Sequence, residues 1–135
     1  FSDLMRLIDV PIVGIEFIQM SSYGSGTKSS QFPEIQSNLS QISIEGQNLL
    51  IIDDIIDTGI TMSALIKALT QLNPSKIEIC TLLDKPSRRE IQIEPRYVGF
   101  TIPDQFVIGY GMDFNQIYRN LPDIYFTQKP NQDEI

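Results

Sequence analysis

Histidine is absent from the sequence, and cysteine occurs only once, at Cys80. The absence of histidine excludes histidine-based acid–base catalysis, cysteine–histidine nucleophile pairs and histidine-ligated metal sites. A single cysteine cannot form a disulfide within the chain, which is typical of a reducing compartment and predicts a cytoplasmic location. Because Cys80 stands inside an apolar run, we interpret it as a small core residue.

Positive charge is also scarce, since 10 Lys and Arg stand against 17 Asp and Glu and the formal net charge is -7. This acidity opposes binding to nucleic acid and to anionic membranes. No apolar run is long enough to span a bilayer, and no signal-peptide pattern opens the chain. A phosphate ligand would have to be met locally, by backbone amides, a few basic side chains or a metal. The length of 135 residues fits one globular domain.

Hydrophobic periodicity predicts an α/β domain. Apolar residues at helical spacing predict an amphipathic helix over 1–8, which Pro11 ends. A buried strand is expected over 12–20, and the serine- and glycine-rich stretch 21–30 is interpreted as either a linker or a lid. An apolar run over 49–53 is typical of a central parallel strand.

The middle of the sequence predicts a strand–helix–strand unit. Apolar residues from 62 to 72 lie on one helical face, and Asn73-Pro74 ends this helix. A second apolar strand is expected over 76–83, and the short connection through one helix makes the two strands parallel. Further strands are predicted over 97–102, 106–110 and 124–127, with one or two helical turns over 114–121.

The segment 49–61, LLIIDDIIDTGIT, is the most informative part of the sequence. It places a turn at the carboxyl end of a strand, where α/β sheets build their sites. Gly59 lets the backbone approach a ligand, Thr58 and Thr61 add hydroxyl donors, and the following helix offers unpaired amides. This combination predicts a cradle for one phosphate. The spacings of a P-loop and of a dinucleotide-binding fingerprint are both missing.

Three carboxylates, Asp53, Asp54 and Asp57, stand beside this cradle and would repel a bare phosphate. They fit a sugar phosphate, whose hydroxyls and bound cation would face the acids. Because no histidine is present, such a cation would be held by carboxylates and water, which favours magnesium. The alternative is that the acids solvate a loop or cap the helix. That alternative suits an isolated Asp-Asp pair better than the whole pattern of acids, Thr, Gly and Thr.

The segment resembles the phosphoribosyl pyrophosphate motif of the purine phosphoribosyltransferases, with its apolar strand, two acids, two apolar residues and Asp-Thr/Ser-Gly-x-Thr. Other segments resemble hypoxanthine-guanine members in the same order: EFI at 16–18, SYG at 22–24, SIEG at 43–46, LLDK at 82–85, YVGF at 97–100, IPD at 102–104, FVIGYGMD at 106–113 and YRNL at 118–121.

The resemblance implies an α/β, type I phosphoribosyltransferase-like fold with a central, mostly parallel sheet flanked by helices. It implies one phosphoribosyltransferase domain over 1–128 and a polar C-terminal tail over 129–135. The domain is expected to be N-terminally incomplete, because a family strand and a Lys-Gly-containing pyrophosphate loop would precede residue 1. A homodimer or homotetramer is also implied.

The implied activity is purine salvage. The 5-phosphoribosyl group of phosphoribosyl pyrophosphate would pass to hypoxanthine or guanine, giving IMP or GMP and pyrophosphate, with Mg²⁺ as cofactor. Asp57 would be the general base that accepts the proton of purine N7. Asp53 and Asp54 would contact the ribose hydroxyls directly or through magnesium, although the family usually has Glu at the first position. The 5′-phosphate would be held by Asp57, Thr58, Gly59, Ile60 and Thr61.

The remaining implied roles concern the base and pyrophosphate. Lys85 would donate to the purine 6-oxygen and so select against adenine. Phe106 would stack on the purine, and Val107 would offer backbone groups to its edge. Asp113 would help bind the purine and hold a second magnesium. Arg119 would bind pyrophosphate as a planar fork, and Ser22 and Tyr23 would close over the reaction.

Two other classes remain open. A non-catalytic relative could sense the sugar phosphate or a nucleotide without turnover. A response-regulator receiver also has a strand that ends in two acids, but it needs an acceptor Asp after a later strand and a Lys further on, whereas Asp84 and Lys85 are adjacent. Incubation with phosphoribosyl pyrophosphate, magnesium and hypoxanthine separates these classes. Taken singly, Lys85 also fits a solvated lysine and Phe106 a core aromatic.

Overall fold

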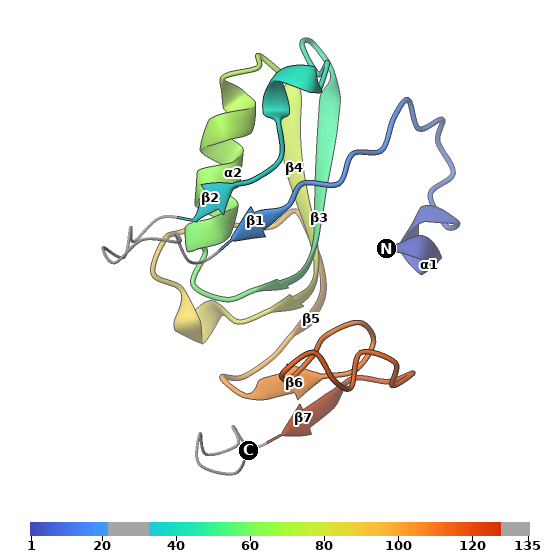
Figure 1. The fold of residues 1–135 in the computed structure, drawn as a ribbon, viewed down its shortest axis with the longest axis vertical. Helices are drawn as coiled ribbons and strands as arrows, with labels where there is room; N and C mark the ends of the chain where they lie inside the picture. Colours follow the sequence, from blue (N-terminus) through green and yellow to red (C-terminus); the bar gives the residue numbers. More distant parts are fainter. Residues whose placement is uncertain (22–32, 128–135) are drawn as a thin grey trace.

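A computed structural model describes residues 1–21 and 33–127. At its centre is a parallel sheet with strand order β3-β4-β5, formed by β3 (Asn48–Ile56), β4 (Lys76–Asp84) and β5 (Tyr97–Thr101). The helix α2 (Ile60–Thr70) connects β3 to β4 (Figure 1). The predicted strand–helix–strand unit with parallel strands is therefore confirmed.

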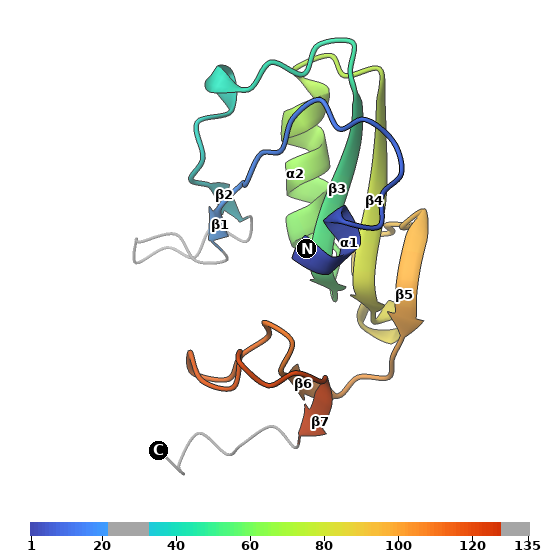
Figure 2. The ribbon, with the colours of Figure 1, turned by 90° about the vertical axis from the view of Figure 1, so that its right-hand side faces the viewer.

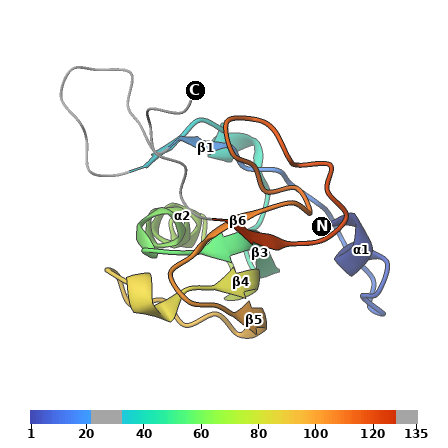
Figure 3. The same ribbon diagram turned by 90° about the horizontal axis from the view of Figure 1, so that it is seen from below.

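The helix α2 covers one face of this sheet (Figures 1 and 3). Its residues Leu65 and Leu69 form a core cluster with Ile44, and Met62 forms another with Ile56 and Ile79. These apolar contacts follow the helical spacing predicted from the sequence, and their removal from water is the main stabilising contribution of the unit. The other described helices are short: the α-helix α1 (Ser2–Met5) and the 3-10 helices η1 (Leu39–Gln41) and η2 (Pro86–Arg88).

A small antiparallel sheet, β6 (Phe106–Ile108) and β7 (Tyr125–Thr127), lies beyond the carboxyl ends of the parallel strands (Figures 1 and 2). A core cluster joins the two sheets, because Leu83 of β4 packs with Ile102, Val107 and Met112. The carboxyl ends of β3 and β4 therefore face a second layer, and a site can form between the two.

The predicted buried strand over 12–20 is wrong for most of its length. Only β1 (Met20–Ser21) is a strand, and it pairs with β2 (Glu34–Ile35) instead of joining the central sheet. Val13 and Phe17 are 85% and 77% exposed. A strand forms only where another strand satisfies its backbone groups, and in the described part of the chain β3 is paired with β4 alone. An apolar pattern does not supply that partner.

Other boundaries differ by smaller amounts. The first helix ends at Met5, so it is shorter than predicted. The helical turns expected over 114–121 are absent, because Phe114 and Ile117 form an antiparallel bridge and Asn115 and Gln116 have positive φ, which an α-helix does not allow. The strands expected over 97–102 and 124–127 are confirmed as β5 and β7, while β6 ends at Ile108, earlier than predicted. None of the helices in the ranges 1–21 and 33–127 is long and apolar enough to cross a membrane.

Candidate functional site

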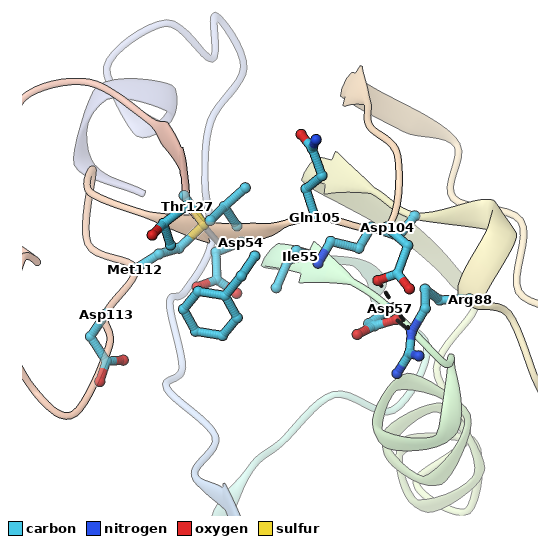
Figure 4. A pocket seen from close by; sticks show the side chains of 12 residues that line it. Asp54, Ile55, Asp57, Arg88, Asp104, Gln105, Met112, Asp113 and Thr127 are labelled. Carbon is cyan, nitrogen blue, oxygen red and sulfur yellow. Dashed lines mark hydrogen bonds and ion pairs between the residues drawn. The ribbon is translucent and has the colours of Figure 1, made fainter. Parts of the chain in front are cut away.

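A pocket of about 660 Å³ opens between the carboxyl ends of β3 and β4 and the β6–β7 layer (Figure 4). This is the position at which α/β sheets place their ligands. Six residues singled out from the sequence contribute to its lining: Asp54, Asp57, Lys85, Phe106, Val107 and Asp113. Residues from three separate segments are thus brought to one cavity.

The turn predicted to hold a phosphate lies between β3 and α2. Gly59 stands immediately before α2 with φ 83°, and no side chain caps the helix. Thr58 Oγ1 accepts a hydrogen bond of 3.4 Å from the Ile60 amide. A Cβ on Gly59 would lie 2.5 Å from the carbonyl oxygen of Ile91, so both the backbone angle and the space require glycine here. The first turn of α2 therefore offers its amides and the positive end of its dipole to an anion.

Asp53 and Asp54 lie within β3, which extends to Ile56, and not in the turn after it. Successive strand residues point to opposite faces, so only Asp54 lines the pocket. Asp53 is half-buried, and its Oδ1 accepts a 3.1 Å hydrogen bond from the Asp54 amide. Burial, and next the negative charge of Asp54, raises the pKa of Asp53 to about 6. These two neighbouring acids are therefore not equivalent.

Lys85 follows β4 directly and is only 6% exposed. Its amide donates to the Ile56 carbonyl at 3.0 Å, which fixes the residue against the end of β3. No acceptor among the described residues bonds its side-chain ammonium, which belongs to the pocket lining. Since most of the residue is buried and its ammonium reaches only the pocket, this position favours a ligand that brings an acceptor.

Asp57 at the start of the phosphate loop, Asp54 before it and the ammonium of Lys85 thus line one pocket. The sequence pattern of the phosphoribosyl transferase domain matches residues 1–115. The chain belongs to the phosphoribosyltransferase family. This membership confirms the resemblance stated from the sequence and the type I phosphoribosyltransferase fold.

Relatives within the phosphoribosyltransferase family agree. The chain is 46% identical over 129 residues to a hypoxanthine-guanine phosphoribosyltransferase from Staphylococcus aureus, covering 96% of this chain and 70% of that protein. It is also 46% identical over 121 residues to a hypoxanthine phosphoribosyltransferase from Salmonella typhimurium, covering 90% of this chain and 67% of that protein.

Solved structures give the same result. A crystal structure of a hypoxanthine phosphoribosyltransferase from Staphylococcus aureus has a TM-score of 0.83 at 46% identity, covering 96% of this chain and 68% of that one. A mutant hypoxanthine phosphoribosyltransferase from Trypanosoma cruzi, in a ternary substrates complex, has a TM-score of 0.84 at 37% identity, covering 95% of this chain and 69% of that one.

Phe106 and Val107 are the first two residues of β6, and both line the pocket. Phe106 is half-buried and meets Phe114 edge to face, with ring centroids 5.7 Å apart. The Val107 side chain is buried in the core cluster with Leu83. Contact of Val107 with a purine would therefore involve its backbone groups, as predicted from the sequence.

Asp113 lines the pocket at the end opposite Asp57 (Figure 4). Its Oδ1 forms a 2.7 Å ion pair with Arg119, and its Oδ2 accepts a 2.8 Å hydrogen bond from the Gln116 amide. Arg119 also donates to the Gly111 carbonyl at 2.8 Å. The structure thus places Arg119 beside Asp113, directed back onto its own loop.

The described residues contain no group of three acidic, histidine or cysteine side chains that could hold a metal by themselves. The predicted positions, one magnesium at Asp53 and Asp54 and a second at Asp113, each involve fewer than three such side chains. Asp54 and Asp113 line the same pocket. This donor set fits Mg²⁺, which is commonly bound through one or two carboxylates together with phosphate oxygens of a substrate.

Sequence reasoning missed three charged residues of the site. Arg88 and Asp104 line the pocket near Asp57 (Figure 4), and Arg89 bonds the backbone of Asp57. The two arginines could have been found from the sequence, because they follow Lys85 closely, after the end of a strand predicted to lie next to the phosphate motif. The predicted closing residues Ser22 and Tyr23 lie outside the described residues.

Proposed function

We propose that this chain transfers the 5-phosphoribosyl group of phosphoribosyl pyrophosphate to a 6-oxopurine, hypoxanthine or guanine, giving IMP or GMP and pyrophosphate. The observation that carries the proposal is that Lys85, a largely buried residue whose ammonium has no acceptor among the described residues, lines the same pocket as Asp57. The relatives from Staphylococcus aureus and Salmonella typhimurium are named for the same phosphoribosyl transfer to these purines. Purine salvage is therefore the role of this enzyme.

The base side of the pocket selects the substrate. Lys85 carries only donors, so a 6-oxygen satisfies it and a 6-amine does not. Phe106 would cover one face of the purine ring, and the Val107 backbone would meet its edge. Leaving a buried donor without an acceptor costs about 1–3 kcal/mol, which disfavours adenine.

The sugar side of the pocket carries the transfer. The loop from Asp57 to Thr61 would hold the 5′-phosphate at the start of α2. As the bond from C1′ to pyrophosphate breaks, positive charge develops on the ribose, and the nearby carboxylates stabilise it. The purine N9 forms the new bond to C1′, and Asp57 accepts the proton released from N7.

A magnesium ion fits the carboxylates of Asp54 and Asp113, together with hydroxyl and phosphate oxygens of the substrate. When bound, it supplies positive charge that neutralises the diphosphate. Asp53, which does not line the pocket, would then contact the ribose hydroxyls less directly than Asp54. Arg119 would contribute its planar fork to pyrophosphate if it leaves Asp113.

The direct test is incubation of the protein with phosphoribosyl pyrophosphate, Mg²⁺ and hypoxanthine, with separate assays for IMP and pyrophosphate. Stoichiometric formation of both products is expected. Binding of phosphoribosyl pyrophosphate without product would support a non-catalytic sensing relative instead. A cytoplasmic location and a homodimeric or homotetrameric assembly stay predictions, and sedimentation analysis tests the latter.

A further inference from the structure

Two consecutive arginines reach Asp57 in different ways. Arg88 Nε donates to Asp57 Oδ1 at 3.1 Å, and the same Nε lies 3.7 Å from Asp104 Oδ1 (Figure 4). Arg89 instead donates to the Asp57 backbone carbonyl at 2.9 Å and is ion-paired with Asp84. One arginine therefore holds the carboxylate of Asp57, and the other holds its backbone.

The segment that carries these arginines also holds the next residue of the phosphate loop. The Thr58 carbonyl accepts hydrogen bonds from the amides of Glu90 and Ile91, at 2.9 and 3.0 Å. Together with Arg89, whose side chain is only 8% exposed, these bonds fix the loop backbone. The Arg88 side chain is 45% exposed and adds nothing to that backbone support. Its contact is with the Asp57 carboxylate alone on this loop.

We propose that Arg88 is a positioning residue for the transfer reaction. It fixes one oxygen of the Asp57 carboxylate and leaves the other free for the purine, while Asp104 forms a longer ion pair with the same guanidinium nitrogen. The inference rests on the proposed function, in which Asp57 accepts the N7 proton. As the N9–C1′ bond forms, the bond from C1′ to pyrophosphate breaks and its electron pair leaves with pyrophosphate. The N7–H bond breaks, and the proton binds the free Asp57 oxygen.

The physical reason is orientation. A carboxylate on a short side chain rotates, and a base contributes to catalysis only while its lone pair faces the proton. A charge-assisted hydrogen bond to one oxygen restricts that rotation. The other charged groups near Asp57 do not make this contact, since they bond elsewhere or line other parts of the pocket: Arg89, Lys85, Asp54, Asp84 and Glu90.

The first experiment separates kcat from KM. Arg88→Gln should lower kcat for hypoxanthine about tenfold, as expected for loss of a hydrogen bond to a charged group, with KM for phosphoribosyl pyrophosphate little changed. Arg88→Lys keeps the cation and should recover part of the loss. Arg96→Gln is the matched control, because Arg96 is 68% exposed and lies outside the pocket lining. Its kcat should equal that of the parent.

The second experiment changes the base. 8-Azahypoxanthine has a more acidic ring N–H than hypoxanthine, so it depends less on a well-oriented base. The kcat loss in Arg88→Gln should therefore be smaller with this analogue. A merely structural role for Arg88 would give the same loss with both bases, and that result would overturn the proposal.

The two levels of inference fail separately. If the parent enzyme forms no IMP, the proposed function is wrong. If the parent is active and both Arg88 variants match it, only the positioning role is wrong. Should Arg88→Gln fold poorly, as judged by its melting temperature, Asp104→Asn gives the same test, because Arg88 then loses its second partner and kcat should again fall more for hypoxanthine than for the analogue.

Discussion

The carbonyl oxygen of Ile91 occupies the space that a side chain on Gly59 would need, at 2.5 Å from the ideal Cβ position. Gly59→Ala should therefore weaken both the fold and the phosphate cradle. The positive φ alone costs about 1–2 kcal/mol for a residue with a Cβ, and the contact with Ile91 adds to this. We expect a lower melting temperature and a higher KM for phosphoribosyl pyrophosphate.

Gly46 is the matched control for this substitution. Its φ is 70°, but nothing lies within 4 Å of its ideal Cβ. Gly46→Ala should show the backbone cost without the steric contact and without a change in KM. Equal loss of stability in the two variants would show that the contact with Ile91 is relaxed at no cost.

Lys85→Met should reduce the discrimination between hypoxanthine and adenine. Methionine keeps an apolar stem and removes the donors, so efficiency with hypoxanthine should fall by about tenfold to a few hundredfold while adenine changes little. Competition assays with both bases measure the ratio of kcat/KM. Lys67→Met, on the exposed side of α2, should leave that ratio unchanged. Full discrimination in the Lys85 variant would mean that another group reads the base.

Asp57→Asn should lower kcat by about two to four powers of ten, the usual contribution of a general base. Binding of phosphoribosyl pyrophosphate should be largely kept, because the loop is held through backbone bonds at Thr58. Rapid-quench kinetics and equilibrium binding separate these effects. Asp123→Asn removes an exposed acid outside the pocket lining and serves as the control. Unchanged turnover in Asp57→Asn would exclude it from the reaction.

Asp53 should make the free energy of unfolding fall with rising pH. Its pKa is about 6 in the folded protein, against 3.8 as the ordinary value. Between these two values the unfolded chain loses its proton first, so stability decreases as pH rises. Asp53→Asn stays neutral and should be more stable than the parent above pH 6, on the order of 1–3 kcal/mol, without divalent cations. Urea unfolding at several pH values tests this, and a difference that persists below pH 4 would contradict it.

The local parts of the fold and site were predictable from the sequence. The motif from Asp53 to Thr61 is contiguous, and a strand end, a glycine and a helix start indicate its local geometry, to which the segment 89–91 adds support that the sequence did not reveal. Lys85 was singled out through the resemblance of the segment 82–85, and its place at the end of the next parallel strand brings it to the same edge of the sheet as the motif.

The parts that depend on distant partners were not predictable. The apolar pattern over 12–20 indicates a strand, but it says nothing about whether another strand is there to pair with it. The contact of Arg88 with Asp57 joins residues 31 positions apart. Asp53 and Asp54 look alike in the sequence, and only the alternation of faces along β3 separates the pocket acid from the half-buried one.

The pocket is divided between two sheets. Asp54, Asp57 and Lys85 come from the end of the β3–α2–β4 unit, and Phe106 and Val107 come from the small β6–β7 sheet, which is joined to that unit through the cluster around Leu83 and Val107. A two-stranded sheet depends on such packing for its stability. Local opening of β6–β7 would therefore remove Phe106 and Val107 from the pocket while the turn at Gly59 stayed folded. Substitutions that change the stability of β6–β7 would then be expected to change the affinity for the purine more than the affinity for the sugar phosphate.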